Sequence, residues 1–370
     1  MKIGVLTSSR ADFGIYYPLV KQLIDDNLFD VEIIAFGTHL KKEYGYTIDE
    51  IKRFGFNVPH QILTNTENNT PEDISLSIGN AIQQFAVFWS ENKFDLVFAL
   101  GDRYEMFAAV SAASPFNLEI AHIHGGETTL GAIDNAYRHS ISLMSKYIFV
   151  STNQYKKRAE QIIENPANVF NVGALSIDNL LHQKFFSILE FEEHFDINLT
   201  KPSILSSFHP ETVSLEKNEG YIEELIGAFE ILQENYQIII TMPNADTMGN
   251  MIREKILTFG KNNSKVKLIE SFGMKGYLTC MKHCNMMIGN TSSGFVEAAF
   301  FPTWVINLGD RQSGRIITKN IVNSAVIKQD ILETVKTITN KQKPTNTNIY
   351  GNGSTAKKII LQLKIMYGLK

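Results

Sequence analysis

Short apolar runs alternate with helical patterns along most of the chain, and a polar turn usually separates one from the next. Residues 3–6 form the first apolar run, and after the turn at 7–10 a helical pattern covers 13–25. This repetition is typical of βα units with a buried parallel sheet. The same reasoning predicts further strands at 31–36, 96–100, 120–123, 147–150 and 169–172, and helices at 104–113 and 133–146.

The pattern becomes irregular and more charged between residues 176 and 201, and then a second series of βα units begins. Strands are predicted at 203–207, 237–241, 266–269, 286–288 and 303–307, and helices at 221–235, 274–284, from 293 onwards and at 331–338. We therefore expect an α/β protein of two Rossmann-like, doubly wound domains, residues 1–185 and 186–354. A last helix within 355–370 can pack back on either half, including the N-terminal domain.

Composition and charge exclude several classes of protein. The 370 residues carry a formal net charge of −4 without a block of five basic residues, which argues against a nucleic-acid partner. Hydrophobic residues make up 44%, enough for a real core. Cys280 and Cys284 lie four apart on a predicted helix, which favours packing thiols over a disulfide scaffold. No signal peptide or membrane-length apolar stretch is evident, so we expect a cytoplasmic protein.

Loops after strands bind ligands in open α/β sheets, and the unusual polar clusters of this chain follow predicted strands. Gly101-Asp102-Arg103 comes directly after the strand at 96–100. Two interpretations stay open here: an Asp–Arg ion pair that fixes the loop, and a functional carboxylate and guanidinium placed at the strand end.

The segment His122-Ile123-His124-Gly125-Gly126-Glu127 is denser still. Strand alternation would put His122 and His124 on one side, and the two glycines would let backbone approach a ligand closely. Asp134, Arg138 and His139 follow on the next predicted helix. A metal site is a rival interpretation, but the HExxH spacing is absent and proton transfer explains the same residue types.

In the second half, Gly289-Asn290-Thr291-Ser292-Ser293-Gly294 precedes a predicted helix, so its hydroxyls and N–H groups can bind phosphate. Phe295 occupies the position of the P-loop lysine, which disfavours an NTPase. An N-cap role for Ser292 or Ser293 is compatible with anion binding. The remaining candidates are polar residues of strand-end loops or of that helix: His209, Glu297, Arg311 and Arg315, with Arg10 from the first domain.

Together these motifs resemble the UDP-N-acetylglucosamine 2-epimerase family, most closely its hydrolysing branch, which makes N-acetylmannosamine or a related sugar for sialic-acid-type biosynthesis. The resemblance covers nearly the whole chain, and the order and spacing of the motifs make it specific. It is carried by Ser9-Arg10-Ala11-Asp12, Gly101-Asp102-Arg103, His122 to Glu127, Ile133-Asp134 with Arg138-His139, Gly289 to Gly294, and Asn307-Leu308-Gly309-Asp310-Arg311-Gln312. It implies the glycosyltransferase-B arrangement, two Rossmann-like domains facing across a cleft that binds the UDP-sugar.

Carried over position by position, the resemblance implies two sets of site residues. The set around the reacting sugar comprises Asp102, Arg103, His124, Glu127 and Asp134. The set that binds UDP comprises Arg10, His209, Asn244, Ser292, Ser293, Glu297 and Arg311. Two departures matter: His124 stands where the non-hydrolysing enzymes and the animal hydrolysing enzyme have a glutamate, and Gly14 stands where the animal enzyme has a hydroxyl. Proton transfer can therefore fall to His124 itself, to Glu127 or to Asp134.

The expected activity is hydrolysis of UDP-N-acetylglucosamine with inversion at C2, giving N-acetylmannosamine and UDP. Alternatives are the same reaction on a UDP-2,4-diacetamido-2,4,6-trideoxyhexose, a non-hydrolysing 2-epimerase, a glycosyltransferase, and a nucleotide-sugar-binding regulator without catalysis. We expect no metal and no cofactor, since the dinucleotide fingerprint GxGxxG is absent and the chemistry needs only acids and bases. The expected partners are a UDP-sugar, water and further copies of the chain in a homodimer or homotetramer, with no nucleic acid and no membrane.

Overall fold

The computed structural model describes residues 1–42, 45–64, 70–243, 246–261 and 263–369, and they form two compact units. Unit 1 comprises Met1–Glu127, Asp134–Leu181 and Ile349–Lys370, and unit 2 comprises Thr128–Ile133 and His182–Asn348. The chain therefore leaves the first unit briefly after Glu127 and returns at Asp134. The expected division into 1–185 and 186–354 instead has these residues, Thr128–Ile133, in the first domain.

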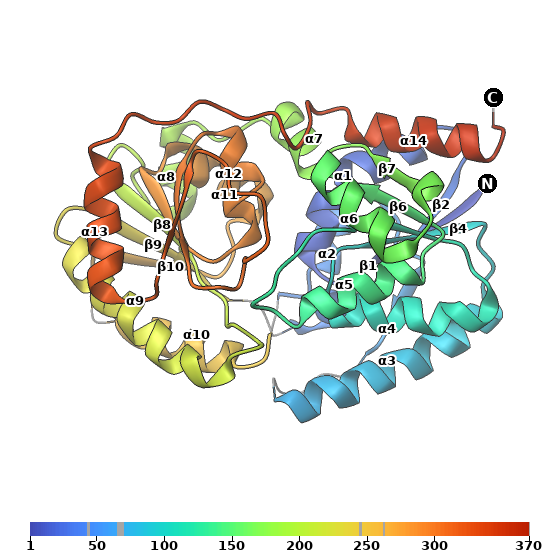
Figure 1. Ribbon diagram of the computed structural model, residues 1–370, viewed down its shortest axis with the longest axis horizontal. Coiled ribbons are helices and arrows are strands. Elements are labelled where there is room, and N and C mark those ends of the chain that lie inside the picture. The colour runs from blue at the N-terminus through green and yellow to red at the C-terminus, as the bar shows by residue number, and fades with distance from the viewer. Residues whose placement is uncertain (43–44, 65–69, 244–245, 262, 370) are drawn as a thin grey trace. The chain divides into compact units, whose positions relative to one another are not determined.

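Unit 1 is built on a parallel sheet with the order β3-β2-β1-β4-β5-β6-β7 (Figure 1). Its strands are β1 (Lys2–Thr7), β2 (Asp30–Phe36), β3 (His60–Ile62), β4 (Leu96–Leu100), β5 (Ile120–Ile123), β6 (Tyr147–Val150) and β7 (Val169–Asn171). Its helices are α1 (Arg10–Ile24), α2 (Ile48–Arg53), α3 (Pro71–Glu91), α4 (Tyr104–Ala113), α5 (Asp134–Leu143), α6 (Asn153–Ile163), α7 (Leu175–His182) and α14 (Thr355–Met366).

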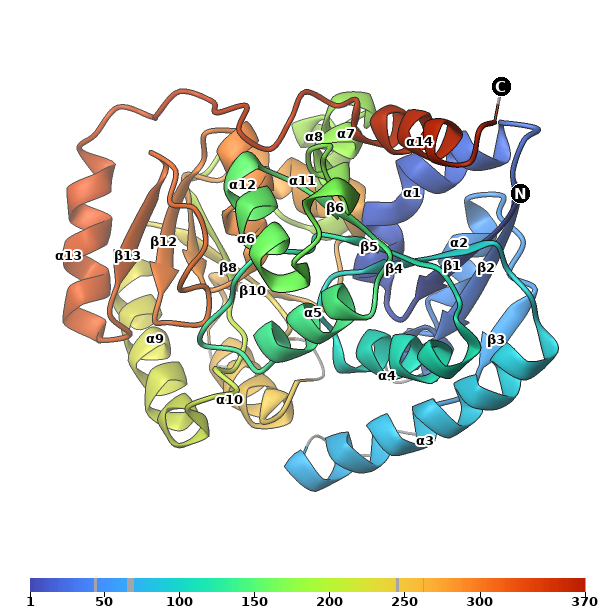
Figure 2. The ribbon, with the colours of Figure 1, turned by 45° about the vertical axis from the view of Figure 1, so that its right-hand side comes forward.

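Helices cover both faces of this sheet because its strands are apolar on both sides. Val5 and Leu6 are neighbours along β1, yet they belong to different buried clusters, as strand alternation requires. The cluster of Val5 includes side chains of α1 and α14, which lie side by side in Figure 1. The cluster of Leu6 includes side chains of α3 and α4, the adjacent helices of Figure 2.

Unit 2 repeats the construction with a parallel sheet of order β10-β9-β8-β11-β12-β13. Its strands are β8 (Ser203–Ser207), β9 (Gln237–Thr241), β10 (Val266–Ile269), β11 (Met286–Gly289), β12 (Trp304–Leu308) and β13 (Ile321–Ser324). Its helices are α8 (Ile188–Phe195), α9 (Asn218–Leu232), α10 (Gly249–Lys261), α11 (Gly273–His283), α12 (Glu297–Phe300) and α13 (Lys328–Thr339). Cys280 and Cys284 are buried free thiols in its core, which confirms their packing role.

Both sheets have the same pattern of strand order, and it determines where a ligand can bind. In unit 1 the order reverses between β1 and β4, and in unit 2 it reverses between β8 and β11. Ligands of open parallel sheets bind outside the carboxyl ends of the strands at such switch points. The loops that begin at Ser8 and Gly101, and those that begin at Phe208 and Asn290, therefore occupy the expected positions for binding residues.

The helices of the described residues differ in length and in apolar content. None of them combines the length and the apolar composition that crossing a membrane requires.

Candidate functional site

An ion pair at the end of β4 organises the polar cluster of unit 1. The carboxylate of Asp102 accepts a hydrogen bond from the guanidinium of Arg138, a residue of α5 that is only 2% exposed. The same guanidinium donates to the carbonyl oxygen of His124 over 2.8 Å and lies 3.9 Å from the carboxylate of Glu127. Arg138 thus brings three of the predicted site residues together.

Arg103 makes a separate ion pair. Its guanidinium donates two hydrogen bonds, of 2.9 and 3.1 Å, to the buried carboxylate of Glu105 in the first turn of α4. Its charge also acts on Asp12, whose pKa is raised by burial and is partly lowered again by Arg103 and by hydrogen bonds from Ser8. Asp102 and Arg103 therefore each have their own partner, and the interpretation as a mutual Asp–Arg pair is wrong.

His122, within β5, is a neutral imidazole with a fixed tautomer. Its Nε2 lies 2.7 Å from the carbonyl oxygen of Gly101, and its Nδ1 lies 2.9 Å from the hydroxyl of Ser142. A carbonyl oxygen only accepts, so Nε2 carries the proton and Nδ1 accepts from Ser142. Burial lowers the pKa of His122 to about 3, so the ring stays neutral at neutral pH. His122 therefore fixes the turn that carries Asp102.

This neutral imidazole predicts a loss of stability in acid. The folded-state pKa of His122 is about 3, whereas an unfolded histidine titrates near its ordinary value of 6.5. The unfolded chain then binds more protons between these values, so stability falls as pH decreases through 6.5. From pH 7 to pH 5 this residue should cost about 2 kcal/mol of unfolding free energy.

Urea unfolding at several pH values, monitored on the wild type and on His122→Gln, measures this contribution. The pH dependence of His122→Gln should be shallower by that amount. His194→Gln is the matched control, because it makes the same chemical change at an exposed histidine. Parallel curves for His122→Gln and wild type would contradict the prediction.

His124 does not continue the strand. β5 ends at Ile123, and His124 adopts a left-handed backbone with φ of 67°, so the expected placement of His122 and His124 on one side by strand alternation is wrong. The two glycines that follow pack against protein. A Cβ on Gly125 would lie 2.4 Å from the side chain of Ile148, and one on Gly126 would lie 2.3 Å from the carbonyl oxygen of Tyr155. They therefore allow the loop to pack on β6 and α6.

Glu127 is buried and pairs with His124. One carboxylate oxygen of Glu127 lies 2.6 Å from Nδ1 of His124 and accepts a hydrogen bond of 3.1 Å from the hydroxyl of Ser151. Asp134 begins α5, and its charge is among those that raise the pKa of Tyr137, after burial of that phenol. Asp102, His124 and Glu127 thus share one cluster, with Asp134 four residues before Arg138 on the same helix.

In unit 2, Asn290 connects the loops that follow β8 and β11. Its side-chain amide accepts from the N–H of His209 over 2.7 Å and donates to the carbonyl of His209 over 2.8 Å. The backbone carbonyl of Asn290 accepts from the side chain of Gln312, whose own oxygen accepts from Arg315. His209 is therefore held by its backbone, and Arg315 is 8% exposed and bonded to Gln312.

The serine pair lies in a tight turn and does not open a long helix. Ser292–Gly294 forms a single 3-10 turn, and the helix α12 that follows spans only Glu297–Phe300. The expected helix from residue 293 is therefore wrong, as is the N-cap role of Ser292 or Ser293, because Thr291 and Val296 precede the two short segments. Any phosphate at this loop must be held by hydroxyl and backbone groups without the dipole of a long helix.

Hydroxyl groups surround Ser293. Its Oγ lies 2.6 Å from the phenol oxygen of Tyr277 and 3.2 Å from Oγ1 of Thr291. Tyr277 also lies 3.4 Å from the hydroxyl of Ser207, at the end of β8, and burial raises the pKa of its phenol to about 12. Tyr277 thus remains a protonated hydroxyl that supports Ser293, while Ser292 is exposed.

The other UDP candidates lie in different places. In unit 2, the guanidinium of Arg311 donates to the carbonyl of Pro210 and to the carboxylate of Asp246, both over 3.2 Å. Glu211 holds the same loop by accepting from the backbone N–H groups of Asp310 and Arg311. Arg10 begins α1 of unit 1, with its guanidinium 3.9 Å from Glu50, and Asn244 lies outside the described residues.

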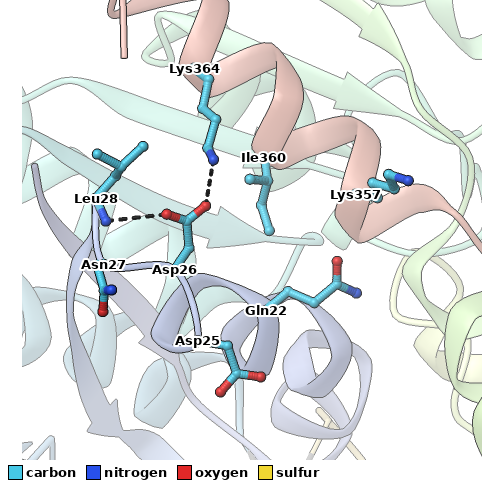
Figure 3. Close-up of a pocket in the computed structure, with 8 residues that line it drawn as sticks. All are labelled: Gln22, Asp25, Asp26, Asn27, Leu28, Lys357, Ile360 and Lys364. Atoms are coloured by element: carbon cyan, nitrogen blue, oxygen red, sulfur yellow. Dashed lines mark hydrogen bonds and ion pairs between the residues drawn. The ribbon is translucent and has the colours of Figure 1, made fainter. Parts of the chain in front are cut away.

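Metal centres and pockets are two other kinds of site. Within the described part of the chain, no group of three or more His, Cys, Asp or Glu side chains is arranged to hold a metal ion. An open pocket of about 570 Å³ lies between the end of α1 and α14, where Asp26 pairs with Lys364 (Figure 3). None of its lining residues belongs to the two predicted sets, so it is separate from the strand-end clusters.

Sequence reasoning did not assign a role to several residues that hold these clusters. Arg138, Asn290 and Gln312 were visible within motifs, whereas Ser151 and Tyr277 had no signal of their own because their partners come from distant parts of the sequence. Two doubly wound parallel sheets with polar side chains at both switch points define a Rossmann-like α/β protein.

The comparisons with known proteins agree with this class. The model of the family described as UDP-N-acetylglucosamine 2-epimerase matches residues 21–364. The chain therefore belongs to the UDP-N-acetylglucosamine 2-epimerase family, which confirms the resemblance, and it is an enzyme of that family. It is similar in fold to the crystal structure of the Neisseria meningitidis enzyme bound to UDP-GlcNAc, with a TM-score of 0.84, 18% identity and coverage of 98% of this chain and 99% of that one. The predicted glycosyltransferase-B-like fold is thereby confirmed.

Two relatives are more similar in sequence. A GDP/UDP-N,N'-diacetylbacillosamine 2-epimerase (hydrolyzing) of Campylobacter jejuni is 36% identical over 326 residues, which cover 88% of this chain and 84% of the relative. The polysialic acid biosynthesis protein P7 of Escherichia coli is 35% identical over 331 residues, 90% of this chain and 84% of that protein.

Proposed function

We propose that the protein hydrolyses UDP-N-acetylglucosamine with inversion at C2 and releases N-acetylmannosamine and UDP. The observation that carries the proposal is the cluster of Asp102, His124 and Glu127 around Arg138, because a protein that only binds nucleotide sugars has no need of buried acids and an imidazole there. The similarity to a hydrolysing 2-epimerase and to a polysialic acid biosynthesis protein supports hydrolysis and this type of product.

Two sets of residues would bind the proposed substrate. The uridine diphosphate would bind the segments that follow β8, β11 and β12, through His209, Ser292, Ser293, Glu297 and Arg311, together with Asn244 and Arg10. The hexosamine would meet Asp102, Arg103, His124, Glu127 and Asp134. The position of these loops at the two switch points supports the assignment of one set to the diphosphate and the other to the sugar.

The C2 proton of the resting sugar is not acidic, so the reaction has to begin at the anomeric carbon. When the C1–O bond breaks, its electron pair leaves with UDP, and positive charge at C1 acidifies the neighbouring C–H. A base then takes the C2 proton, and the electrons of that bond form the C1–C2 double bond of a 2-acetamidoglucal. Water then adds its hydroxyl to C1, and C2 is protonated on the face opposite to the one that lost its proton. Two faces require two proton-transfer groups, in agreement with the several acids gathered in unit 1.

A second substrate is favoured by a specific observation. The Campylobacter jejuni relative, at 36% identity, is named for N,N'-diacetylbacillosamine, a 2,4-diacetamido sugar. A UDP-2,4-diacetamido-2,4,6-trideoxyhexose undergoes the same elimination and rehydration, since its C1 and C2 are those of an N-acetylhexosamine. Both substrates are compatible with the cluster, because the chemistry at C1 and C2 is shared.

Incubation of the protein with each UDP-sugar in deuterated water tests the proposal. We expect UDP and a free 2-epimeric sugar with one deuterium at C2, detected by mass spectrometry and proton NMR, with activity retained in chelator. An epimerised sugar still attached to UDP would instead indicate a non-hydrolysing enzyme, and turnover that requires an added acceptor would indicate a glycosyltransferase. UDP-sugar binding without turnover of either substrate would indicate a regulator.

We also expect the protein to form a homodimer or homotetramer. Light scattering measures the mass of the assembly and so tests this expectation.

A further inference from the structure

His124 and Glu127 form a buried imidazole–carboxylate pair. Nδ1 of His124 lies 2.6 Å from a carboxylate oxygen of Glu127, and the two side chains are 11% and 3% exposed. The hydroxyl of Ser151 donates to the same oxygen over 3.1 Å. An ionised carboxylate only accepts hydrogen bonds, so Nδ1 carries a proton, and in the neutral tautomer of this ring Nε2 presents a lone pair.

Nε2 of His124 has no hydrogen-bond partner among the described residues, although it is buried. An unsatisfied buried polar atom costs about 1–3 kcal/mol, so an atom of this kind calls for an explanation. His122, two residues away, shows the contrast, because both of its ring nitrogens have partners within the protein. His124 is thus oriented from one nitrogen and left available at the other.

The backbone of His124 is fixed as well as its ring. Its φ of 67° is a conformation that non-glycine residues rarely adopt, and the N–H bonds to the carbonyl of Phe149 over 2.9 Å. The carbonyl of His124 accepts from Arg138, the residue that also binds Asp102. A strained residue that is held by its N–H, its carbonyl and its ring is typical of a functional position.

We propose that Nε2 of His124 is the atom that removes the C2 proton, and that Glu127 and Ser151 are positioning residues for this imidazole. The assignment rests on the proposed function and deepens it. The C2–H electrons form the C1–C2 double bond as UDP leaves, the proton is transferred to Nε2, and the imidazolium is stabilised by the Glu127 carboxylate. Because one side chain reaches one face of C2, the second proton transfer falls to Asp102 or Asp134.

A double-mutant cycle on His124→Gln and Glu127→Gln tests the assignment. Glutamine at 127 still offers an oxygen to Nδ1 and to Ser151 but lacks the charge that stabilises the imidazolium. Loss of the base should lower kcat about 10²–10⁴-fold, and Glu127→Gln about 10-fold or more, with UDP affinity unchanged in both. Residues that act as a unit are not additive, so the double variant should be no slower than His124→Gln alone. Glu91→Gln, at an exposed end of α3, is the matched control.

An independent readout follows the imidazole itself. In nitrogen-15 spectra of the wild type, His124 should be protonated at Nδ1 and unprotonated at Nε2, and Glu127→Gln should shift the Nδ1 resonance while leaving thermal stability within the range of the control. Multiplicative effects in the double variant, full activity of His124→Gln, or an Nε2-protonated ring would overturn the assignment while the wild type still turns over. A wild type inactive on both UDP-sugars would overturn the proposed function, and this assignment with it.

Discussion

Asp102→Asn is expected to lower kcat for the proposed UDP-sugar hydrolysis about 10²–10⁴-fold, the usual contribution of a positioned acid or base. The carboxylate of Asp102 lies at the switch point of unit 1 and pairs with Arg138, which also holds the backbone of His124. Asparagine has nearly the same shape but can neither accept a proton nor neutralise the buried guanidinium. Steady-state kinetics and calorimetric titration with UDP separate these effects, and UDP affinity should change less than 3-fold, since the amide removes no proposed phosphate contact.

The other end of the same strand provides the matched control. Asp95 immediately precedes β4, is exposed, and accepts a hydrogen bond of 2.7 Å from the backbone N–H of Lys2. Asp95→Asn makes the same chemical change at the start of β4, the end of the strand that is remote from Asp102. The kcat of this variant should therefore equal that of the wild type. If Asp102→Asn retained full turnover, Asp102 would have no part in proton transfer. Equal losses in both variants would mean that the strand, and not the carboxylate, had been disturbed.

The strands could be predicted from sequence because both sheets are parallel and buried. A strand covered on both faces is a continuous apolar run, and the runs at 96–100, 120–123, 147–150 and 203–207 coincide with β4, β5, β6 and β8. Helices with a narrow apolar face carry a weaker signal. α6, in which only Tyr155 and Ala159 are buried, was not predicted, since such a helix lies on the surface of its sheet.

The segment after β11 shows why the local pattern failed. Phe295, Ala298 and Ala299 are apolar and suggest a helix from Ser293, yet each is buried against the core by a 3-10 turn followed by four helical residues. Gly289 has φ of 155°, and a Cβ there would lie 2.2 Å from the carbonyl of Ser207, so the loop is fitted to β8. Tertiary packing thus overrides helical periodicity at this loop, which cannot be read from neighbouring residues.

The candidate site was predictable in its residue types and strand ends, but not in its pairings. Sequence order places Asp102 beside Arg103, whereas the fold pairs Asp102 with Arg138, which is 36 residues away. Likewise, Tyr277 reaches Ser293 from another helix. Such partners depend on how helices lie across strand ends, and a motif contains no information about that geometry.

Asn290→Ala is expected to destabilise unit 2 by about 2–4 kcal/mol, because it removes two side-chain hydrogen bonds to buried backbone groups. Asn290 is 1% exposed, and its amide makes both hydrogen bonds to the backbone of His209. Without them the loop after β8 loses its connection to the loop of Ser292 and Ser293. UDP affinity should therefore fall about 10-fold or more, since each 1.4 kcal/mol of lost interaction is a factor of ten.

Urea unfolding measures the first effect and calorimetric titration with UDP the second. Asn285→Ala is the control, because Asn285 is exposed, precedes β11 and makes one side-chain hydrogen bond, of 2.9 Å, to the N–H of Ser203. It should cost about 1 kcal/mol or less and leave UDP affinity unchanged. If Asn290→Ala is too unstable to titrate, Asn290→Asp takes its place. The carboxylate of this variant can still accept a hydrogen bond from the N–H of His209 but cannot donate one to the carbonyl. Its negative charge would also repel a diphosphate at the adjacent serines, so wild-type affinity in Asn290→Asp would place the diphosphate away from this loop.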